Sequence, residues 1–220
     1  MPVIRCVPGK TNTNHFQENY ILSLLELVLK ETEMSNSDNE PMNGVFRNNA
    51  KLYAEKGYDV FPVYEKCKHV LQNGCMGATT DPDIIAVWEQ KHSNANIGIK
   101  AGDHVLVLDI DNKGGKNGSN DLAEIEAVLG KLPPCPTVHT PTGGEHRYFV
   151  KPDTDVIGTV GVKWNGEKTG IDIRVGNQYV LAPPSIHPET KKTYSWQNPL
   201  LHRDEFCPNY HRLGKSNFFL

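Results

Sequence analysis

The sequence lacks long hydrophobic runs and any excess of basic charge. No apolar run reaches the roughly 18–20 residues that a membrane-spanning helix needs, and no secretory signal begins the chain. We therefore expect no membrane partner and a cytoplasmic location. The 220 residues carry 23 Lys and Arg against 26 Asp and Glu, a net charge of −3. A polyanionic partner would have to be met by a local basic patch.

Paired cysteines are also lacking. The five cysteines are odd in number and scattered, with no CxxC pair, which favours free thiols in a reducing compartment over a disulfide framework. Cys67, His69 and Cys75 could supply three zinc ligands, but no fourth ligand follows at a suitable spacing. We therefore predict free thiols.

The pattern of the chain predicts one domain with an appendage at each end. Residues 18–34 carry apolar side chains at helical spacing, which predicts an amphipathic helix that either docks on the main domain or binds a partner. The polar stretch 35–44 reads as a linker. We therefore divide the chain into an N-terminal helix and linker (1–44), a globular domain (45–200) and a C-terminal tail (201–220).

Strands with interspersed helices predict an α/β (α+β) sheet domain. Asp81 followed by Pro82 is typical of a helix start. Along the predicted helix 120–129 we expect Leu122, Ile125, Val128 and Leu129 to face inward. Predicted helices cover 46–56, 83–91 and 120–129, and predicted strands cover 59–64, 96–100, 104–111, 137–140, 146–150, 171–175 and 178–182.

The segment VLVLDID, residues 105–111, ends a predicted strand with two acids. Alternation places Asp109 and Asp111 on the same face as Val105 and Val107. Two such carboxylates repel each other unless a cation lies between them, and their hard oxygens suit Mg²⁺ or Mn²⁺ bound together with a phosphate. The same residues are also consistent with a strand that ends in a solvated Asp-Asn turn.

The segment TGGEHRYF, residues 142–149, places a histidine directly after a glycine turn. His146 and Tyr148 face one way on the predicted strand, and Arg147 and Phe149 face the other. A histidine at the entrance of a strand can reach a phosphate oxygen. It can equally be an ordinary histidine with a structural role.

A third acidic strand, IDIRV at 171–175, has Asp172 and Arg174 on one face. They form either an ordinary ion pair or a third metal-binding carboxylate beside a bidentate triphosphate clamp. The following strand ends in a Pro-Pro turn, with Ser185 and His187 beyond it. Both side chains can donate to phosphate, although such turns are often only structural.

Together, these segments are the equipment for two-metal nucleotidyl transfer. Three carboxylates could hold two divalent ions, while the histidine and arginine neutralise a triphosphate. Such ions lower the pKa of an attacking 3′-hydroxyl and stabilise the leaving pyrophosphate. The order and spacing of the segments carry this hypothesis, because each segment alone has a structural explanation.

The sequence resembles the primase-polymerase (Prim-Pol) domain of the archaeo-eukaryotic primase superfamily, found in replication proteins of plasmids, phages and integrated mobile elements. The resemblance implies an RRM-like catalytic sheet with flanking helices, joined to a smaller N-terminal α/β part. It extends from about residue 47 to about 197 and includes GYDVFPV, ATTDPDIIAVWEQ, NIGIKAG, LVLDID, TPTGGEHRYF and IDIRVGNQYVLAPPSIHP.

The resemblance implies roles for particular residues. It makes Asp109, Asp111 and Asp172 the catalytic acids that bind Mg²⁺ or Mn²⁺. It also implies a nucleotide-binding set, formed by His146, Arg174, Ser185 and His187.

The resemblance further implies a DNA primase/polymerase that makes and extends primers from NTPs or dNTPs on a single-stranded DNA template. A helicase or a helical accessory domain is the expected protein partner, and the replication machinery of a prokaryotic mobile element is the expected setting. Two alternatives stay open: a non-catalytic nucleic-acid-binding replication-initiator module of the same fold, and a metal-dependent nuclease.

The net charge is unevenly distributed. Residues 18–40 carry a net charge of −5, which leaves +2 for the rest of the chain. The predicted domain is therefore compatible with nucleic acid. Basic residues that could follow a template or primer backbone are Arg147, Lys151, Lys163, Lys168, Arg174, Lys191 and Lys192.

Overall fold

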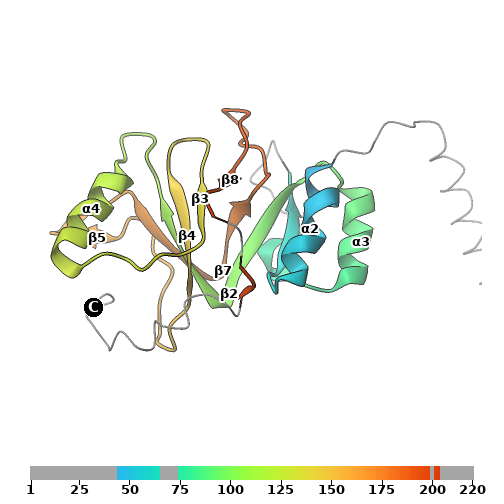
Figure 1. The fold of residues 1–220 in the computed structure, drawn as a ribbon, viewed down its shortest axis with the longest axis horizontal. Helices are drawn as coiled ribbons and strands as arrows, with labels where there is room; N and C mark the ends of the chain where they lie inside the picture. The colour runs from blue at the N-terminus through green and yellow to red at the C-terminus, as the bar shows by residue number, and fades with distance from the viewer. Residues whose placement is uncertain (1–43, 65–73, 199–200, 204–220) are drawn as a thin grey trace, which may run out of the picture. The chain divides into compact units, whose positions relative to one another are not determined.

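The computed structural model describes residues 44–64, 74–198 and 201–203 (Figure 1). The predicted helix at 18–34, the linker up to residue 43 and the tail from 204 lie outside this part, as do Cys67 and His69. Cys75 and Cys135 form no disulfide, as predicted. Within the described ranges, no helix is long and apolar enough to cross a membrane.

The domain combines helices with an antiparallel sheet, which confirms the predicted α+β class. The helices are α2 (Val45–Glu55), the short 3₁₀ helix η1 (Gly74–Gly77), α3 (Pro82–Lys91) and α4 (Gly118–Leu129). The strands are β1 (Val60–Val63), β2 (Asn96–Ile110), β3 (Thr137–His139), β4 (Glu145–Val150), β5 (Lys163–Trp164), β6 (Glu167–Lys168), β7 (Ile171–Ala182) and β8 (Ser195–Trp196).

Helix α3 begins as its sequence predicts. The Asp81 carboxylate accepts hydrogen bonds from the N–H groups of Asp83 and Ile84, and Pro82 occupies the first helical position. Helix α4 differs from prediction at its end, since Val128 is 70% exposed and Leu129 is 36% exposed. The apolar cluster under α4 is covered by its first two turns, so the last turn has no core to pack against.

The strands β2 and β7 form the spine of the sheet and run from the α4 end of the domain toward α2 (Figure 1). One edge of β2 pairs with β7 along most of its length. The other edge pairs with β1 near its start and with β4 near its end. Strand β3 then joins β4, and β8 joins β3. All these pairings are antiparallel, and the end of β2 pairs with β4 on one edge and with β7 on the other.

Each spine strand is continuous where the sequence predicts two strands. The break between the predicted strands 96–100 and 104–111 is an irregularity within β2, and the break at Gly176 between the predicted strands 171–175 and 178–182 is one within β7. Gly102 and Gly176 lie opposite each other in the ladder with φ of +64° and +60°, and the register shifts on both sides of Gly102. Paired glycines in the left-handed region bend both strands together, so neither chain reverses.

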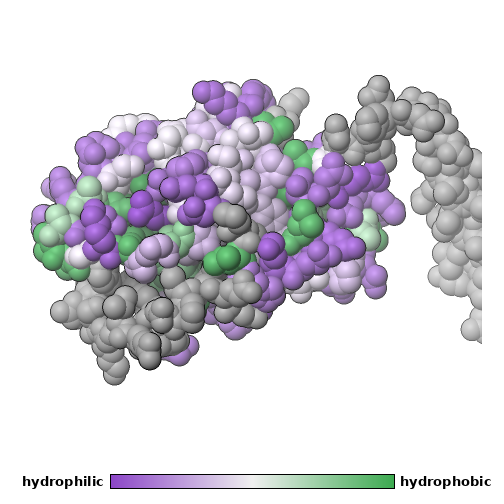
Figure 2. All heavy atoms as spheres, viewed as in Figure 1, coloured by the Kyte–Doolittle hydropathy of each residue, from purple (hydrophilic) through white to green (hydrophobic). Residues whose placement is uncertain are grey.

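Alternation along β2 separates two cores. Val105 and Val107 face the larger cluster, which includes Tyr148 and residues of α2. Leu106, Leu108 and Ile110 face the smaller cluster under α4. On the visible face of the surface, hydrophobic residues form small separate areas among hydrophilic ones (Figure 2). Asp109 follows Val107 on the side of the larger cluster, which places its carboxylate at the end of that core.

Candidate active site

Three polar residues form a row across the middle of the sheet. Asp109 of β2 pairs in register with His146 of β4 on one side and with Asp172 of β7 on the other. Directly opposite residues of neighbouring strands project to the same face. Three segments that are 26 or more residues apart in the sequence are therefore brought together by strand pairing.

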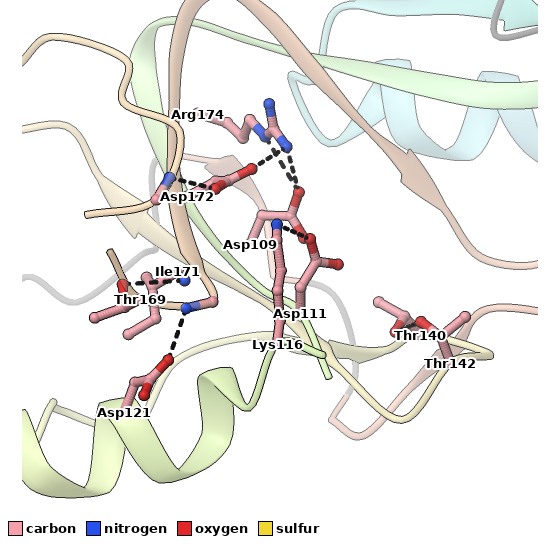
Figure 3. A network of polar contacts seen from close by, with 12 residues as sticks. Asp109, Asp111, Lys116, Asp121, Thr140, Thr142, Thr169, Ile171, Asp172 and Arg174 are labelled. Atoms are coloured by element: carbon pink, nitrogen blue, oxygen red, sulfur yellow. Dashed lines mark hydrogen bonds and ion pairs between the residues drawn. The ribbon is translucent and has the colours of Figure 1, made fainter. Parts of the chain in front are cut away.

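Arg174 joins the two carboxylates of this row (Figure 3). Its Nε and Nη2 donate to Oδ2 of Asp109 at 3.1 and 2.8 Å, and Nη2 also donates to Oδ2 of Asp172 at 2.7 Å. The other Asp172 oxygen accepts the Gly161 N–H at 2.7 Å. Asp172 is buried, and these contacts compensate its charge there.

Asp111 lies one residue beyond the end of β2 and is held by its backbone. Its N–H donates to the Gly170 carbonyl at 2.8 Å, and its carbonyl accepts the Gly118 N–H at 2.9 Å. Its side chain accepts from Lys116 Nζ at 2.8 Å (Figure 3). This hydrogen bond raises the pKa of Lys116, and the charges of Asp111, Asp172 and Asp109 act in the same direction.

Close backbone packing fixes the position of Asp111. A Cβ at Gly118 would lie 2.6 Å from the Gly170 oxygen, and a Cβ at Gly170 would lie 2.7 Å from the Asp111 oxygen. Asp121 of α4 accepts the Gly170 N–H at 2.7 Å. Sequence reasoning missed Asp121 and both glycines, because their role depends on contact between distant segments.

The two glycine-rich loops beside the site are tied together. The Asn112 amide donates to the Gly143 carbonyl at 2.6 Å and to Ser119 Oγ at 2.7 Å. Gly144 also packs tightly, since a Cβ there would lie 2.1 Å from the Ile110 oxygen. The start of the loop after β2 and the turn before β4 are therefore held together next to Asp111 and His146.

His146 is buried at the far end of the row. Its Nε2 lies 3.6 Å from Asp109 Oδ1, and Nδ1 has no hydrogen-bond partner among the described residues. Its ring packs against Tyr194 with centroids 5.7 Å apart. Burial lowers the pKa of His146, although Asp109 acts in the opposite direction. The ring is therefore neutral near pH 7.

Ser185 and His187 differ in how they relate to this site. Ser185 is fully buried and its Oγ accepts the Ile97 N–H at 2.9 Å. This contact attaches the Pro-Pro turn to the start of β2, so its position does not support the predicted phosphate contact. His187 Nδ1 accepts the N–H groups of Glu189 and Thr190, and its ring lies 6.3 Å from Tyr194. Tyr194 thus lies between the two histidine rings.

One of the basic residues predicted to follow a template or primer backbone, Arg147, does not face the site. Arg147 faces α4 and contacts Glu126 of that helix at 3.8 Å, as well as Glu145 of its own strand at 2.8 Å. Its face of β4 is opposite to that of His146, so Arg147 is not available for phosphate at the site. Lys163 and Lys168 are exposed and lie opposite each other in the β5–β6 hairpin, and neither has an ion-pair partner within the described part of the chain.

The donor atoms at this site fit a hard divalent ion, because all three acids offer carboxylate oxygens. Asp109 and Asp172 present oxygens to a single nitrogen of Arg174, and Asp111 presents one to Lys116. In this conformation, basic side chains neutralise the acids. No three His, Cys, Asp or Glu side chains converge as a metal-ligand group in the ranges that the structure describes.

Comparison with protein-family models gives one finding for this chain. Residues 50–208 match the family described as bifunctional DNA primase/polymerase, N-terminal. This range contains the whole row formed by Asp109, His146 and Asp172. The chain therefore belongs to the bifunctional DNA primase/polymerase family, as the sequence resemblance predicted. A search of curated proteins gives no match.

Proposed function

We propose that this chain is a template-directed nucleotidyltransferase, a DNA primase/polymerase that makes and extends primers from nucleoside triphosphates by two-metal-ion catalysis. The observation that carries the proposal is the register of Asp109 between His146 and Asp172. Family membership supports the general class of activity. The carboxylate oxygens of Asp109, Asp111 and Asp172 are of the type that hard divalent cations prefer, which supports a chemistry that uses such cations.

The acids Asp109, Asp111 and Asp172 would hold Mg²⁺ or Mn²⁺. When bound, such ions lower the pKa of the primer 3′-hydroxyl and stabilise the negative charge of the leaving pyrophosphate. Arg174 supplies a planar guanidinium that can bind two phosphate oxygens once it leaves the carboxylates. His146 would contact the nucleotide from the same face of the sheet, where its Nε2 lies 3.6 Å from Asp109 Oδ1.

The partners that this function requires are a single-stranded DNA template, a primer and NTPs or dNTPs. The exposed lysines of the β5–β6 hairpin support contact with a phosphate backbone. A helicase or a helical accessory domain is a further expected partner. We also place the activity in the cytoplasmic replication machinery of a plasmid, phage or mobile element.

The test is template-dependent incorporation on a single-stranded template with Mg²⁺ or Mn²⁺. NTPs and dNTPs are supplied separately, with and without an annealed primer. We expect the Asp109→Asn, Asp111→Asn double variant to lose about 100-fold or more of the incorporation rate. Asp103→Asn, which changes an exposed acid of the same strand, is the matched control and retains the activity.

Other outcomes identify the alternatives. Incorporation that is unchanged in the double variant would overturn the proposal. Salt-dependent template binding without metal-dependent nucleotide affinity would instead identify a non-catalytic replication-initiator module. Metal-dependent shortening of the template would identify a nuclease.

A further inference from the structure

Lys116 forms an ion pair with Asp111, and it comes from a loop without regular structure. Its Nζ lies 2.8 Å from Asp111 Oδ2, and its side chain is 39% exposed (Figure 3). Gly114 and Gly115 precede it with φ of +61° and +83°, and open space surrounds both. The loop can therefore change the position of Lys116 without displacing packed residues.

The ion pair with Lys116 occupies a carboxylate oxygen of Asp111, which the proposed function requires for binding a divalent ion. If Asp111 binds a divalent ion, its carboxylate cannot also keep an ammonium group at hydrogen-bond distance without strong repulsion between the two cations. A partly exposed ion pair contributes little stability, so displacement of Lys116 is inexpensive. The displaced ammonium then stays beside the site on a flexible four-carbon stem.

Arg174 differs from Lys116 in this respect. Three hydrogen bonds hold its guanidinium between Asp109 and Asp172, within the row of the sheet. Lys116 has one such contact, to the acid at the margin of the site. Lys116 is therefore the cation that is more easily transferred from an acid to an incoming anion.

We infer that Lys116 binds the triphosphate of the incoming nucleotide after a divalent ion displaces it from Asp111. The inference rests on the proposed function and adds one residue to its phosphate-binding set. The ligand class is a nucleoside triphosphate bound with a divalent cation. The loop from Asn112 to Asn117 supplies the residue, and the Asn112 amide holds the start of that loop against the turn before β4.

The test compares Lys116→Gln with Lys113→Gln in the full chain. Lys113 is an exposed lysine of the same loop, without an ion-pair partner in the described segments. Mn²⁺ binding is measured by calorimetry without nucleotide, and dATP binding is measured in the presence of Mn²⁺. We expect Lys116→Gln to bind Mn²⁺ about threefold tighter, because a competing cation is gone, and to bind dATP about tenfold more weakly. The control stays within about twofold of the wild type in both assays.

The outcomes separate this inference from the proposed function. Wild-type dATP affinity in Lys116→Gln overturns the inference, and so does Mn²⁺ binding that is unchanged or weaker. Failure of the wild-type chain to bind dATP with Mn²⁺ overturns both the inference and the proposed function. Circular dichroism of both variants shows whether each is folded.

Discussion

Arg174 directs two nitrogens, Nε and Nη2, at a single oxygen of Asp109, at 3.1 and 2.8 Å. Nη2 is shared with Asp172 at 2.7 Å, so one planar cation holds two carboxylates from neighbouring strands. Like charges directly opposite each other destabilise a sheet. The guanidinium therefore stabilises the fold as well as the site.

Replacement of Arg174 by glutamine should therefore destabilise the domain. Arg174→Gln leaves Asp109 and Asp172 facing each other without a counter-ion, and Asp172 is buried. We expect the free energy of unfolding to fall by about 2–3 kcal/mol, as measured by urea denaturation. The control is Asp172→Asn combined with Arg174→Gln, which removes the repulsion and should recover part of the loss. If the double variant is no more stable than Arg174→Gln alone, carboxylate repulsion is not the cause.

Replacement by alanine should lower the free energy of unfolding by different amounts at two adjacent glycines. In Gly144→Ala the new Cβ would lie 2.1 Å from the Ile110 backbone oxygen, whereas a Cβ at Gly143 meets nothing within 4 Å. Gly143→Ala suffers only from its φ of +82°. We expect a loss of about 3 kcal/mol or more for Gly144→Ala and about 1 kcal/mol for Gly143→Ala. Thermal or urea unfolding measures both, and equal losses would contradict the packing explanation.

Buried Tyr53 should make the domain sensitive to alkaline pH. Burial raises its pKa from 10.0 to about 12, and its hydroxyl donates to the Pro183 carbonyl and accepts from Trp196 Nε1. Between these pH values, Tyr53 keeps its proton in the folded chain and loses it in the unfolded chain. Its stabilising contribution is thus complete below pH 10 and is lost as the pH rises toward 12.

The measurement is the free energy of unfolding at pH 9 and at pH 11. Because one pKa unit corresponds to about 1.4 kcal/mol, Tyr53 alone should account for about 1 kcal/mol of the decrease over this interval. Tyr53→Phe is less stable at pH 9 but should show a shallower decrease. Tyr64→Phe removes an exposed tyrosine hydroxyl and is the matched control. An equally steep decrease in Tyr53→Phe would show that other groups dominate.

The lysine pair of the β5–β6 hairpin should contribute to strand binding. Lys163 and Lys168 lie directly opposite each other, and the adjacent Gly161 N–H donates to Asp172. A phosphate backbone along this hairpin would relieve their repulsion and pass close to the site. We expect Lys163→Gln with Lys168→Gln to reduce the slope of log affinity against log salt by up to about 1.4 for single-stranded DNA.

Fluorescence anisotropy with a labelled oligonucleotide at several salt concentrations measures this slope. The control is Lys51→Gln with Lys91→Gln, which removes two exposed lysines from α2 and α3. It changes the net charge equally but should leave the slope close to the wild-type value. Equal effects of the two double variants would show that only net charge matters.

The face of its strand on which each site residue lies follows from local rules. Alternation along a strand places Asp109 on the face of Val107, and Asp172 on the face of Arg174, whatever the rest of the fold does. The start of α3 follows equally from Asp81 and Pro82. These features depend only on residues that are adjacent in the sequence, so they can be predicted from the sequence alone.

Other features depend on segments that are distant in the sequence. The sequence predicts four short strands where the structure has two long bent strands, β2 and β7. The reason is that Gly102 and Gly176 pair with each other within the strand ladder, and neither of them forms a turn. Ser185 looks like a phosphate ligand by its type, but its hydroxyl is engaged by Ile97. Arg147 likewise looks like a phosphate ligand by its type, but it forms an ion pair with Glu126 of α4.

The sequence by itself determined the class of fold, the family and the residue types that carry the chemistry, since periodicity and motifs are properties of short segments. Only the tertiary structure decided that Asp109 lies between His146 and Asp172, and that Arg174 and Lys116 neutralise the acids. Strand register and the close approach of Gly118 to Gly170 produce that arrangement. Both are set by packing between segments that are distant along the chain.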